Sequence, residues 1–512
     1  MLVKTYAAAM LGIDARLVTI EVNVSKGVKF YLVGLPDNAV KESHERIMSA
    51  LQYNNIPWPR RQVIINMAPA DIKKEGAAYD LPLAVGMLAA NETITGEDVS
   101  QYIMMGELSL DGALRPVKGV LPIAIMAREM GFKGFIVPKE NSHEAAVVNN
   151  LNVYGAESIT EVVQFLNHET TIEPTQVNTR EEFAKADEQF AFDFADVKGQ
   201  EFARRAIEVA AAGGHNILMV GAPGSGKSMM AKCIPSILPP LTLHESLETT
   251  KIHSVAGKLM RDASLIKSRP FREAHSTVSD VALVGGGANP QPGEISLAHN
   301  GVLFLDELPE FKRSALEVLR QPLEDRRITI SRAKYSIQYP ASFMLVAAMN
   351  PCPCGNYNNP NKECTCAPGV VQRYLSRISG PLLDRIDLHI EVIPVSNDKM
   401  LESAPSEPSR EIRRRVIAAR NIQGERFKDE TGIHCNAQMT PKMMRKYCPL
   451  DAECTKVLKT AIERLHFSAR AYDRILKVAR TIADLDNSPQ IAPNHIREAL
   501  SYRNLDRENW GG

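Results

Sequence analysis

The pattern of hydrophobic and polar residues first changes near residue 166. Residues 1–166 contain short β-rich runs such as Val18–Val24 and Gln62–Asn66, which lie between helix-like segments such as Ala39–Asn54. Such a mixture of strand and helix signals predicts an α+β domain. The next residues, 167–192, are mostly polar and charged, which predicts a linker to the rest of the chain.

Two further patterns follow the linker. Along residues 193–395, strand and helix signals alternate, as is typical of a parallel α/β sheet. Along residues 396–512 the pattern becomes helical, most clearly at 410–420 and 454–484. The chain is therefore expected to contain three domains: α+β, α/β and helical.

A phosphate-binding loop lies near the start of the α/β region. Residues Gly221–Ser228 match the pattern G-x-x-x-x-G-K-[ST], between the apolar run Asn216–Val220 and the helix-like segment Met229–Pro235. In this strand-loop-helix context, backbone amides surround the phosphates, while Lys227 reaches the β and γ oxygens and Ser228 holds Mg²⁺. The predicted ATP-binding residues are Gly221, Ala222, Pro223, Gly224, Ser225, Gly226, Lys227 and Ser228.

Polar residues also end two later apolar runs. Gly301–Leu305 is followed directly by Asp306 and Glu307, and a second apolar run ends in Asn350. The carboxyl ends of parallel strands meet at one edge of the sheet, so these side chains should converge on the nucleotide. We expect Asp306 to hold Mg²⁺, Glu307 to polarise the attacking water and Asn350 to position the water or contact the γ-phosphate.

Four of the eight cysteines are close together in the sequence. They form C-x-C-x₉-C-x-C in a segment rich in proline, asparagine and glycine, and they are Cys352, Cys354, Cys364 and Cys366. Four thiolates on one short loop suit tetrahedral zinc, which predicts a structural zinc site at 352–366. The alternative is a set of unligated cysteines. The scattered Cys233, Cys435, Cys448 and Cys454 are expected to be packing residues.

Several basic residues are candidates for phosphate contacts. The segment 372–387 offers Arg373, Arg377 and Arg385, and Arg470 lies at the start of a predicted helix. Each has the alternative of a surface ion pair. The segment 324–338 predicts a hairpin that carries Arg326, Arg327, Arg332 and Lys334. Such a hairpin suits either a nucleic-acid backbone or solvent at a sheet edge.

Composition excludes some classes of protein. The 512 residues include 60 basic and 60 acidic side chains, so any contact with nucleic acid must come from local patches. The first residues lack the pattern of a secretion signal, and no apolar run approaches the roughly 18 residues of a membrane span. We therefore expect a cytoplasmic protein.

Together these motifs resemble the YifB/ComM family of magnesium-chelatase-like AAA+ ATPases over nearly the whole chain. The segments that carry the resemblance are 196–200, 210–216, the phosphate loop, 282–287, 292–299, 305–311, 348–355 and 379–387. The resemblance implies an AAA+ core with an α-helical lid, assembled as a hexamer. It also implies a helix-2 insert over roughly Lys251–Ala298, and a hairpin around Arg326–Lys334 that lines the pore of the ring.

The same resemblance assigns roles to individual residues. It makes Asn350 sensor 1, Arg385 the arginine finger and Arg470 sensor 2. The chain departs from the family pattern F-R-x-P-H-H at Phe271–Ser276, where alanine and serine replace the proline and the second histidine. Roles that belong to that segment are therefore not transferred.

The N-terminal domain is similar to the Lon protease domain, which has a ribosomal S5 domain 2-like fold. The similar segments are Pro69–Asp80 and Gly106–Gly119. In that comparison the nucleophilic serine falls at or near Ala78 and the catalytic lysine near Leu121. Because neither side chain can act as a nucleophile or base, we expect a binding or assembly domain without peptidase activity.

Two functions remain open from the sequence. The family resemblance implies ATP-driven branch migration or helicase activity on single-stranded or branched DNA, in recombination during natural transformation. The alternative is a protein-remodelling or metal-chelatase-type motor subunit whose client is not DNA. The basic hairpin favours DNA.

Overall fold

The structure is a computed structural model, and it divides the chain into two compact units. It describes residues 2–184, 190–259, 264–287, 290–332, 335–359, 362–395, 406–465 and 468–503. The first unit contains Met1–Ala186 and Thr242–Lys267, and the second contains Asp187–Leu241 and Ser268–Gly512. A segment that follows the phosphate loop in the sequence therefore belongs to the same unit as the N-terminal domain.

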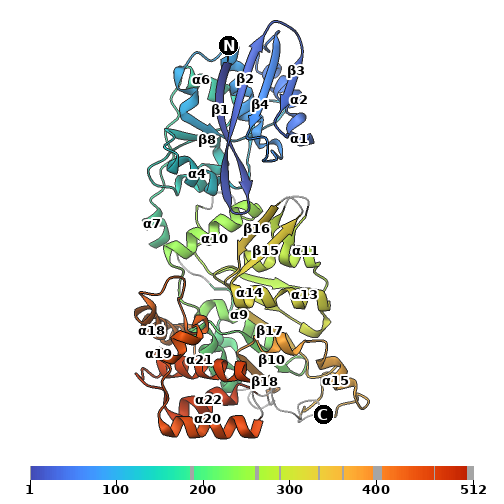
Figure 1. Cartoon of the computed structure of the whole chain (residues 1–512), viewed down its shortest axis with the longest axis vertical. Coiled ribbons are helices and arrows are strands. Elements are labelled where there is room, and N and C mark those ends of the chain that lie inside the picture. The colour runs from blue at the N-terminus through green and yellow to red at the C-terminus, as the bar shows by residue number, and fades with distance from the viewer. Residues whose placement is uncertain are drawn as a thin grey trace. The chain divides into compact units, whose positions relative to one another are not determined.

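A mixed seven-stranded sheet forms the centre of the first unit (Figure 1), in the order β3-β4-β2-β1-β5-β8-β9. Antiparallel pairing joins β1 to β2 and β2 to β4, and the other neighbours are parallel. The strands are β1 (Leu2–Leu11), β2 (Asp14–Ser25), β3 (Phe30–Val33), β4 (Gln62–Ala68), β5 (Tyr102–Met104), β8 (Gly134–Pro138) and β9 (Asn152–Ala156). A short pair, β6 (Glu107–Leu108) and β7 (Leu114–Arg115), lies outside this sheet.

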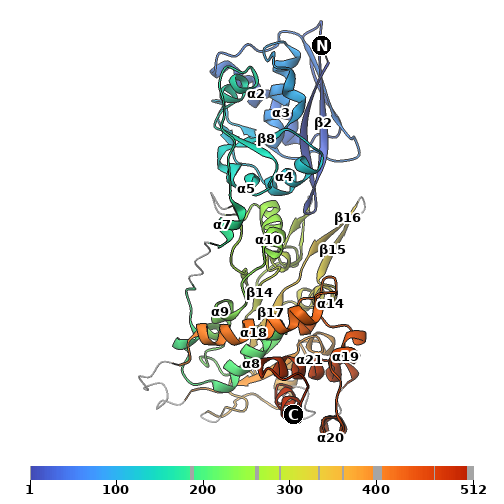
Figure 2. The ribbon, with the colours of Figure 1, turned by 90° about the vertical axis from the view of Figure 1, so that its left-hand side faces the viewer.

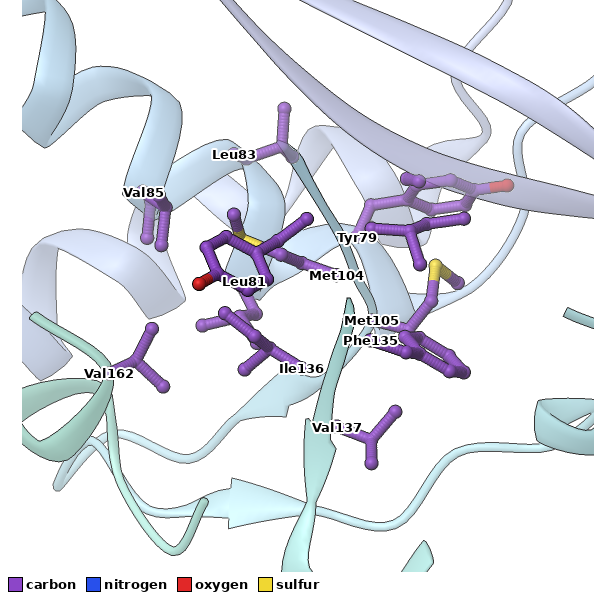
Figure 3. Packing of buried hydrophobic residues seen from close by; sticks show 14 of the residues in the cluster. Tyr79, Leu81, Leu83, Val85, Met104, Met105, Phe135, Ile136, Val137 and Val162 are labelled. Carbon is purple, nitrogen blue, oxygen red and sulfur yellow. The ribbon is translucent and has the colours of Figure 1, made fainter. Parts of the chain in front are cut away.

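The hydrophobic core of the first unit follows from the period of its strands. In β2, Val18, Ile20, Val22 and Val24 are buried and alternate with more exposed residues, as expected when one face of a strand is covered. Helix α3 (Asp80–Ala90) is buried along its whole length and packs against β1 and β2. Figure 3 shows how aromatic, aliphatic and sulfur side chains from several elements fill this core. The prediction of an N-terminal α+β domain is confirmed.

Helix α10 (Leu243–Ala256) belongs to this first unit. It starts with a capping box, in which Thr242 and Glu245 each accept a hydrogen bond from the backbone amide of the other. It packs against α4 (Val120–Glu129), and the Ser254 carbonyl accepts a hydrogen bond from the Gly119 amide. The remaining helices of the unit are α1 (Asn38–Lys41), α2 (Ser43–Tyr53), α5 (Ser142–Ala146), α6 (Ile159–Leu166) and α7 (Thr179–Ala184).

Part of the expected linker packs onto the first unit. The Thr175 amide donates to the Val153 carbonyl in β9, and the Thr179 hydroxyl donates to the Val147 carbonyl. Ile172 also packs against the core. The chain enters the second unit at residue 187, within the segment 167–192.

A fully parallel five-stranded sheet forms the centre of the second unit, in the order β11-β14-β17-β10-β18. The strands are β10 (Ile217–Gly221), β11 (Phe271–Ala274), β14 (Val302–Leu305), β17 (Met344–Met349) and β18 (Leu388–Val392). Every residue of the three central strands is buried, as expected of a parallel sheet covered on both faces. This confirms the predicted parallel α/β core.

The C-terminal helices share a hydrophobic core with this sheet. Helix α18 packs against α8, α9 and α21, and Figure 2 shows α18, α8 and α21 close together. The longer helices of the second unit are α8 (Glu201–Gly213) and α9 (Lys227–Ile237), and in the C-terminal region α18 (Ser409–Phe427), α19 (Pro441–Tyr447), α20 (Ala452–Leu465), α21 (Ala469–Leu485) and α22 (Pro493–Ser501). The predicted helical C-terminal region is thus present, in the same compact unit as the parallel sheet.

The expected bounds of the helix-2 insert, Lys251–Ala298, are wrong. Lys251 lies inside α10, and the range includes β11, which is an edge strand of the central sheet. Between β11 and β14, a small hairpin of β12 (Gly285–Gly286) and β13 (Gln291–Pro292) separates α11 (Asp280–Val284) from α12 (Glu294–Leu297). Sequence periodicity did not show that the chain crosses into the other unit before it forms β11.

A second hairpin stands between β14 and β17. Its strands are β15 (Arg327–Arg332) and β16 (Tyr335–Pro340), which pair antiparallel and confirm the predicted hairpin. Figure 2 shows the two strands extending beside each other. Helices α13 (Arg313–Val318) and α14 (Arg320–Asp325) lead into it, and α15 (Val370–Leu375) and α16 (Gly380–Leu383) lie between β17 and β18. In the part of the chain that the structure describes, no helix has the length and apolar character needed to cross a membrane.

Candidate functional site

The phosphate loop lies between the buried strand β10 and helix α9, as predicted. Gly224 and Gly226 have φ angles of +77° and +91°, a region that glycine adopts without steric cost. Gly221 is required for a different reason: a Cβ atom there would lie 2.3 Å from the Val392 carbonyl oxygen. Gln200 supports the loop from outside, because its side-chain amide donates to the Ser225 carbonyl at 3.3 Å.

The side chain of Lys227 is folded back onto this loop. Its Nζ atom donates to the carbonyl oxygens of Gly221 at 2.7 Å and Ala222 at 3.0 Å. A further contact, at 3.4 Å, joins it to Oδ1 of Asn350. Burial lowers the pKa of Lys227, while the carboxylate of Asp306 acts in the opposite direction. An anionic ligand near this ammonium would favour its charged form.

Asp306 and Ser228 contact each other directly. The Ser228 hydroxyl donates to Oδ2 of Asp306 at 2.6 Å, and Oδ1 accepts the Glu307 amide at 2.8 Å. Hydroxyl and carboxylate oxygens are the ligands that Mg²⁺ takes from proteins, so the donor set fits this ion. The sequence prediction that these two residues lie together is thus consistent with the geometry.

Glu307 combines exposure with an uncommon backbone conformation. It is exposed, and its φ and ψ angles of 52° and 47° are left-handed, which is uncommon for a residue with a side chain. It directly follows β14 and precedes a 3₁₀ turn at Leu308–Glu310. Such strained residues concentrate at functional sites. Because the chain turns at Glu307, its carboxylate lies outside the sheet and is accessible to water.

Residues from three strand ends therefore gather at one edge of the parallel sheet. Lys227 follows β10, Asp306 follows β14 and Asn350 follows β17, and hydrogen bonds connect Lys227 with Asn350 and Ser228 with Asp306. The ammonium of Lys227, the carboxylates of Asp306 and Glu307 and the amide of Asn350 match the groups needed at such an edge to bind a nucleoside triphosphate with Mg²⁺.

A buried polar network behind this edge was not predicted. The Asn216 side chain accepts the Leu345 amide at 2.9 Å and donates to the Arg385 carbonyl at 3.1 Å. The Asn216 amide donates to the Asp387 carboxylate at 2.9 Å. One asparagine thereby joins the starts of β10 and β17 to the segment before β18. Its position directly before an apolar strand was the only sequence signal.

Asp387 extends the network to the helical region. Its side chain is fully buried, and its Oδ1 atom pairs with the Arg474 guanidinium of α21 at 2.9 Å. Burial alone would raise the pKa of Asp387, but Arg474 and His215 reverse this effect and hold the pKa well below its usual range. His215 in turn contacts the Thr481 hydroxyl at 2.8 Å. The parallel sheet and α21 are thus joined by a charged, hydrogen-bonded contact.

The candidate arginines have different surroundings. Arg385 is 6% exposed, and its guanidinium pairs with Glu324 of α14 at 2.7 Å. Arg377 is exposed and pairs with Glu310 at 3.0 Å, in the turn that follows Glu307. Arg470 is also exposed, with its guanidinium 3.9 Å from Asp384. Arg373 is exposed as well.

The four clustered cysteines come together in space. The Sγ atoms of Cys352, Cys354, Cys364 and Cys366 all lie within 4.8 Å of one another. The Cys352 sulfur is 3.3 Å from that of Cys354 and 3.8 Å from that of Cys364. Zinc–sulfur bonds of about 2.3 Å in a tetrahedron separate the sulfur atoms by about 3.8 Å, so this cluster has the size of a zinc site.

The hairpin β15–β16 has one polar and one apolar face. Ile328, Ile330, Ile337 and Tyr339 are buried, whereas the alternate positions hold Arg327, Thr329, Ser331, Ser336 and Gln338. The buried face contacts the β12–β13 hairpin, where the Tyr339 hydroxyl donates to the Pro290 carbonyl. Arg326 belongs to the base of the hairpin, where its guanidinium is 3.4 Å from the Ser342 hydroxyl. Lys334 and the side chain of Arg332 lie outside the described residues.

The first unit has no matching chemistry at the two Lon-like positions. Ala78 lies in a 3₁₀ turn before α3 and packs against the core, and Leu121 in α4 is fully buried. Both side chains are apolar. The absence of peptidase activity remains a prediction.

Three family models cover most of the chain. The model described as "Magnesium chelatase, subunit ChlI" matches residues 193–400. "Subunit ChlI of Mg-chelatase" matches residues 20–141, and "Magnesium chelatase, subunit ChlI C-terminal" matches residues 406–503. The matched ranges include the parallel sheet with its phosphate loop, much of the mixed sheet and the C-terminal helices.

Individual relatives extend this similarity. Competence protein ComM of Haemophilus influenzae is 44% identical over 505 residues, which cover 98% of this chain and 97% of the relative. YifB of Escherichia coli K12 is 43% identical over 508 residues, with the same coverage of both chains. Lon protease 2 of Bacillus subtilis is 28% identical over 153 residues, which are 28% of this chain and 27% of that protein. With its parallel ATPase sheet, ChlI-like N-terminal domain and full-length similarity to these relatives, the chain belongs to the YifB/ComM family of magnesium-chelatase-like AAA+ ATPases.

Proposed function

We propose that this protein is a hexameric motor that couples ATP hydrolysis to DNA remodelling, as branch migration or helicase activity in recombination and natural transformation. The observation that carries the proposal is the β15–β16 hairpin, which presents a row of polar side chains on the ATPase unit. The similarity to competence protein ComM also supports a role in DNA remodelling.

The residues at the sheet edge supply the chemistry of ATP hydrolysis. Lys227 would contact the β and γ phosphates, and Ser228 and Asp306 would hold Mg²⁺, which neutralises phosphate charge when bound. Glu307 orients and polarises the attacking water, and Asn350 acts beside the γ-phosphate. The contacts of Lys227 with Asn350 and of Ser228 with Asp306 support the roles of these four residues, because they bring the four side chains to one place.

The polar face of the hairpin suits contact with a nucleic-acid backbone. Arg327 offers a guanidinium, and Thr329, Ser331, Ser336 and Gln338 offer hydroxyl and amide groups of the kind that donate to phosphate oxygens. The opposite face is anchored by Ile328, Ile330 and Tyr339, so the hairpin is fixed to the ATPase unit. It connects to α14 at one end and to β17, which Asn350 directly follows, at the other. This connection offers a route from nucleotide state to DNA contact.

We also infer that the trans-acting arginine is Arg385. Arg377 is tied to the turn after Glu307 of its own chain, whereas Arg385 pairs with Glu324 directly before the DNA-binding hairpin. Arg385 would exchange Glu324 for the phosphate of a neighbouring subunit. Arg470 would act as sensor 2 from the start of α21.

The cysteine cluster is proposed to hold one structural zinc ion. The donor set is four thiols within 4.8 Å of one another, which matches a closed tetrahedral site. The backbone amide of Tyr357 donates to the Cys352 sulfur at 3.3 Å, as amides do around metal-bound thiolates.

Steady-state ATPase measurements test the motor proposal. The rate is measured without DNA, with single-stranded DNA and with a four-way junction, and Glu307→Gln is the inactive control. The proposal predicts that DNA stimulates hydrolysis and that the variant abolishes it. An unchanged rate with both DNA substrates would contradict the proposal and favour the protein-remodelling or chelatase-type alternative.

A further inference from the structure

The cysteine loop makes a close contact with the phosphate loop. Gly355 has a φ angle of +79°, and a Cβ atom there would lie 2.5 Å from Cδ and 2.7 Å from Cγ of Pro223. Real Cβ atoms do not approach carbon atoms so closely, so only glycine fits against the ring. Pro223 is the third residue of the phosphate loop. Any movement of Gly355 toward it would therefore displace the backbone that surrounds the phosphates.

Two cysteines fix the position of Gly355. Its amide donates to the carbonyl oxygen of Cys352 at 2.9 Å, and Cys354 directly precedes it. Cys352 is fully buried, and its sulfur lies 3.3 Å from that of Cys354. A metal ion bound by both sulfurs would hold the chain on either side of Pro353. Gly355 would then have little freedom to leave the Pro223 ring.

The same loop starts at the residue that contacts Lys227. Asn350 accepts from Lys227, and Cys352 follows two residues later. The chain therefore touches the nucleotide site twice within six residues, first at Lys227 and then at Pro223. The cysteine cluster lies between and beyond these two contacts. Without a metal, the residues of the loop would become ordered only when nucleotide binds. The loss of their conformational entropy would then reduce the free energy of nucleotide binding.

We propose that the metal-bound cysteine loop is a positioning element for ATP, which holds Gly355 against Pro223 and Asn350 against Lys227. The inference rests on the zinc site proposed above and does not depend on the DNA activity. Loss of the metal weakens nucleotide binding without removing any residue that contacts the nucleotide.

The first experiment measures metal content and nucleotide affinity together. The full-length protein, purified without chelator, should contain one zinc ion per chain and bind a fluorescent ATP analogue. The double variant Cys364→Ser/Cys366→Ser should lose the zinc and bind the analogue roughly tenfold more weakly, the size expected if nucleotide binding must then order about one more residue of the loop. A wild-type protein without zinc, or a zinc-free variant with unchanged affinity, would overturn the proposal.

Gly355→Ala tests the contact itself. This variant keeps all four cysteines, so it should retain zinc while its affinity for the analogue falls. Gly369→Ala is the matched control, because Gly369 has a similar φ of +76°, but a Cβ atom there would meet no described atom within 4 Å. The control should bind as wild type does. Equal affinities of the two variants would overturn the coupling, whatever the zinc content.

Cobalt(II) substitution separates the site from the coupling. A four-thiolate tetrahedral site should give the visible absorption of cobalt–thiolate coordination in wild type and in Gly355→Ala. If Gly355→Ala loses this absorption, its weaker ATP binding reflects a lost metal, and the claim that the contact transmits the effect is contradicted. Far-ultraviolet circular dichroism of each variant confirms that the comparison is made between folded proteins.

Discussion

The two units of this protein differ at the positions where the sequence comparisons expect catalytic side chains. In the parallel sheet of the second unit, Lys227, Asp306 and Asn350 follow three different strands and are linked to one another or to Ser228 by hydrogen bonds. In the first unit, the sequence comparison expects the Lon nucleophile at or near Ala78 and the base near Leu121, and both of these side chains pack against the hydrophobic core.

This difference shows where the protein keeps charged groups that do not stabilise its fold. A cluster of charged groups is costly to remove from water, so it persists where a ligand or partner completes it. In the first unit, the apolar side chains of Ala78 and Leu121 pack against the core instead. The match to the magnesium chelatase ChlI model at 193–400 lies mostly in the second unit, while a binding or assembly role for the first unit remains a prediction.

Replacement of Arg385 should have the largest effect. If the ATPase edge is completed by a neighbouring subunit, Arg385→Ala should lower the rate of ATP hydrolysis by about 10³–10⁵-fold, as removal of an arginine finger does. ATP binding should remain. Single-turnover hydrolysis and analogue binding measure the two effects, and Arg377→Ala is the matched control. Normal hydrolysis by Arg385→Ala would show that our choice of arginine is wrong.

Glu307→Gln should remove catalysis from within the same chain. The variant keeps the shape of the side chain but cannot polarise water, so hydrolysis should fall by about 10²–10⁴-fold. The affinity for ATP should stay close to that of wild type. Glu317→Gln, a partly exposed glutamate paired with Arg320, should hydrolyse normally. A Glu307→Gln enzyme with substantial turnover would place the catalytic carboxylate elsewhere.

The prediction for Asp387 concerns stability instead of turnover. Asp387→Asn leaves the Arg474 guanidinium without its buried partner, which should cost about 3 kcal/mol of unfolding free energy. Urea unfolding at neutral pH measures this cost. Asp473→Asn, on the same helix as Arg474, is the control.

The pH dependence of this effect has a definite sign. The pKa of Asp387 is lower in the folded than in the unfolded protein, so its stabilisation is complete above the unfolded value, about 3.9. It is lost as the pH falls toward the folded pKa. The difference between wild type and Asp387→Asn should therefore shrink in acid. A constant difference would contradict the ion pair as its source.

Leu121→Lys would restore one Lon-like side chain to the first unit. Because Leu121 is fully buried, the ammonium would lose its hydration, and we expect a loss of about 2–3 kcal/mol in stability. Leu121→Met, which conserves volume, should cost less than about 1.5 kcal/mol. Thermal unfolding measures both. Peptidase activity in Leu121→Lys combined with Ala78→Ser would break the distinction between the two units.

The smallest expected effect concerns Glu144, where α10 joins the first unit. Burial raises the pKa of Glu144, although the Ser254 hydroxyl and the Leu121 amide act in the opposite direction. Its folded pKa lies above the unfolded value, so stability is complete below the unfolded pKa and is lost as the pH rises through the folded pKa.

Glu144→Gln cannot ionise and should not show this loss. The variant should gain on wild type by up to about 1 kcal/mol as the pH rises from about 4 to about 7. Chemical unfolding across this range measures the gain. The control is Glu157→Gln, which replaces an exposed glutamate that pairs with Lys139. If the two pH profiles stay parallel, Glu144 does not ionise in the way that its burial implies.

The sequence was sufficient where function depends on neighbouring residues. The phosphate loop, the acids after β14 and Asn350 after β17 each follow an apolar strand, so their place at the sheet edge could be predicted. The hairpin β15–β16 and the cysteine cluster were also accessible, because each lies within a short segment. Their chemistry is local in the sequence.

Contacts between distant segments could not be predicted in this way. The pairing of Asn216 with Asp387 joins residues 171 positions apart, and the Gly355–Pro223 contact depends on how two loops pack. Helix α10 shows the same limit, because the capping residues Thr242 and Glu245 mark where the helix begins but not which unit it joins. The burial of Arg385 against Glu324 is likewise a property of the folded unit.

The central claim is that ATP hydrolysis at the parallel sheet drives movement of DNA. A labelled four-way junction with long homologous arms tests it directly, with wild type and Glu307→Gln compared in the presence of ATP. We predict conversion of the junction into duplex products by wild type alone, and none with a non-hydrolysable ATP analogue. An intact junction in the presence of active, hydrolysing wild-type protein would contradict the claim and direct attention to a protein or metal-chelatase client.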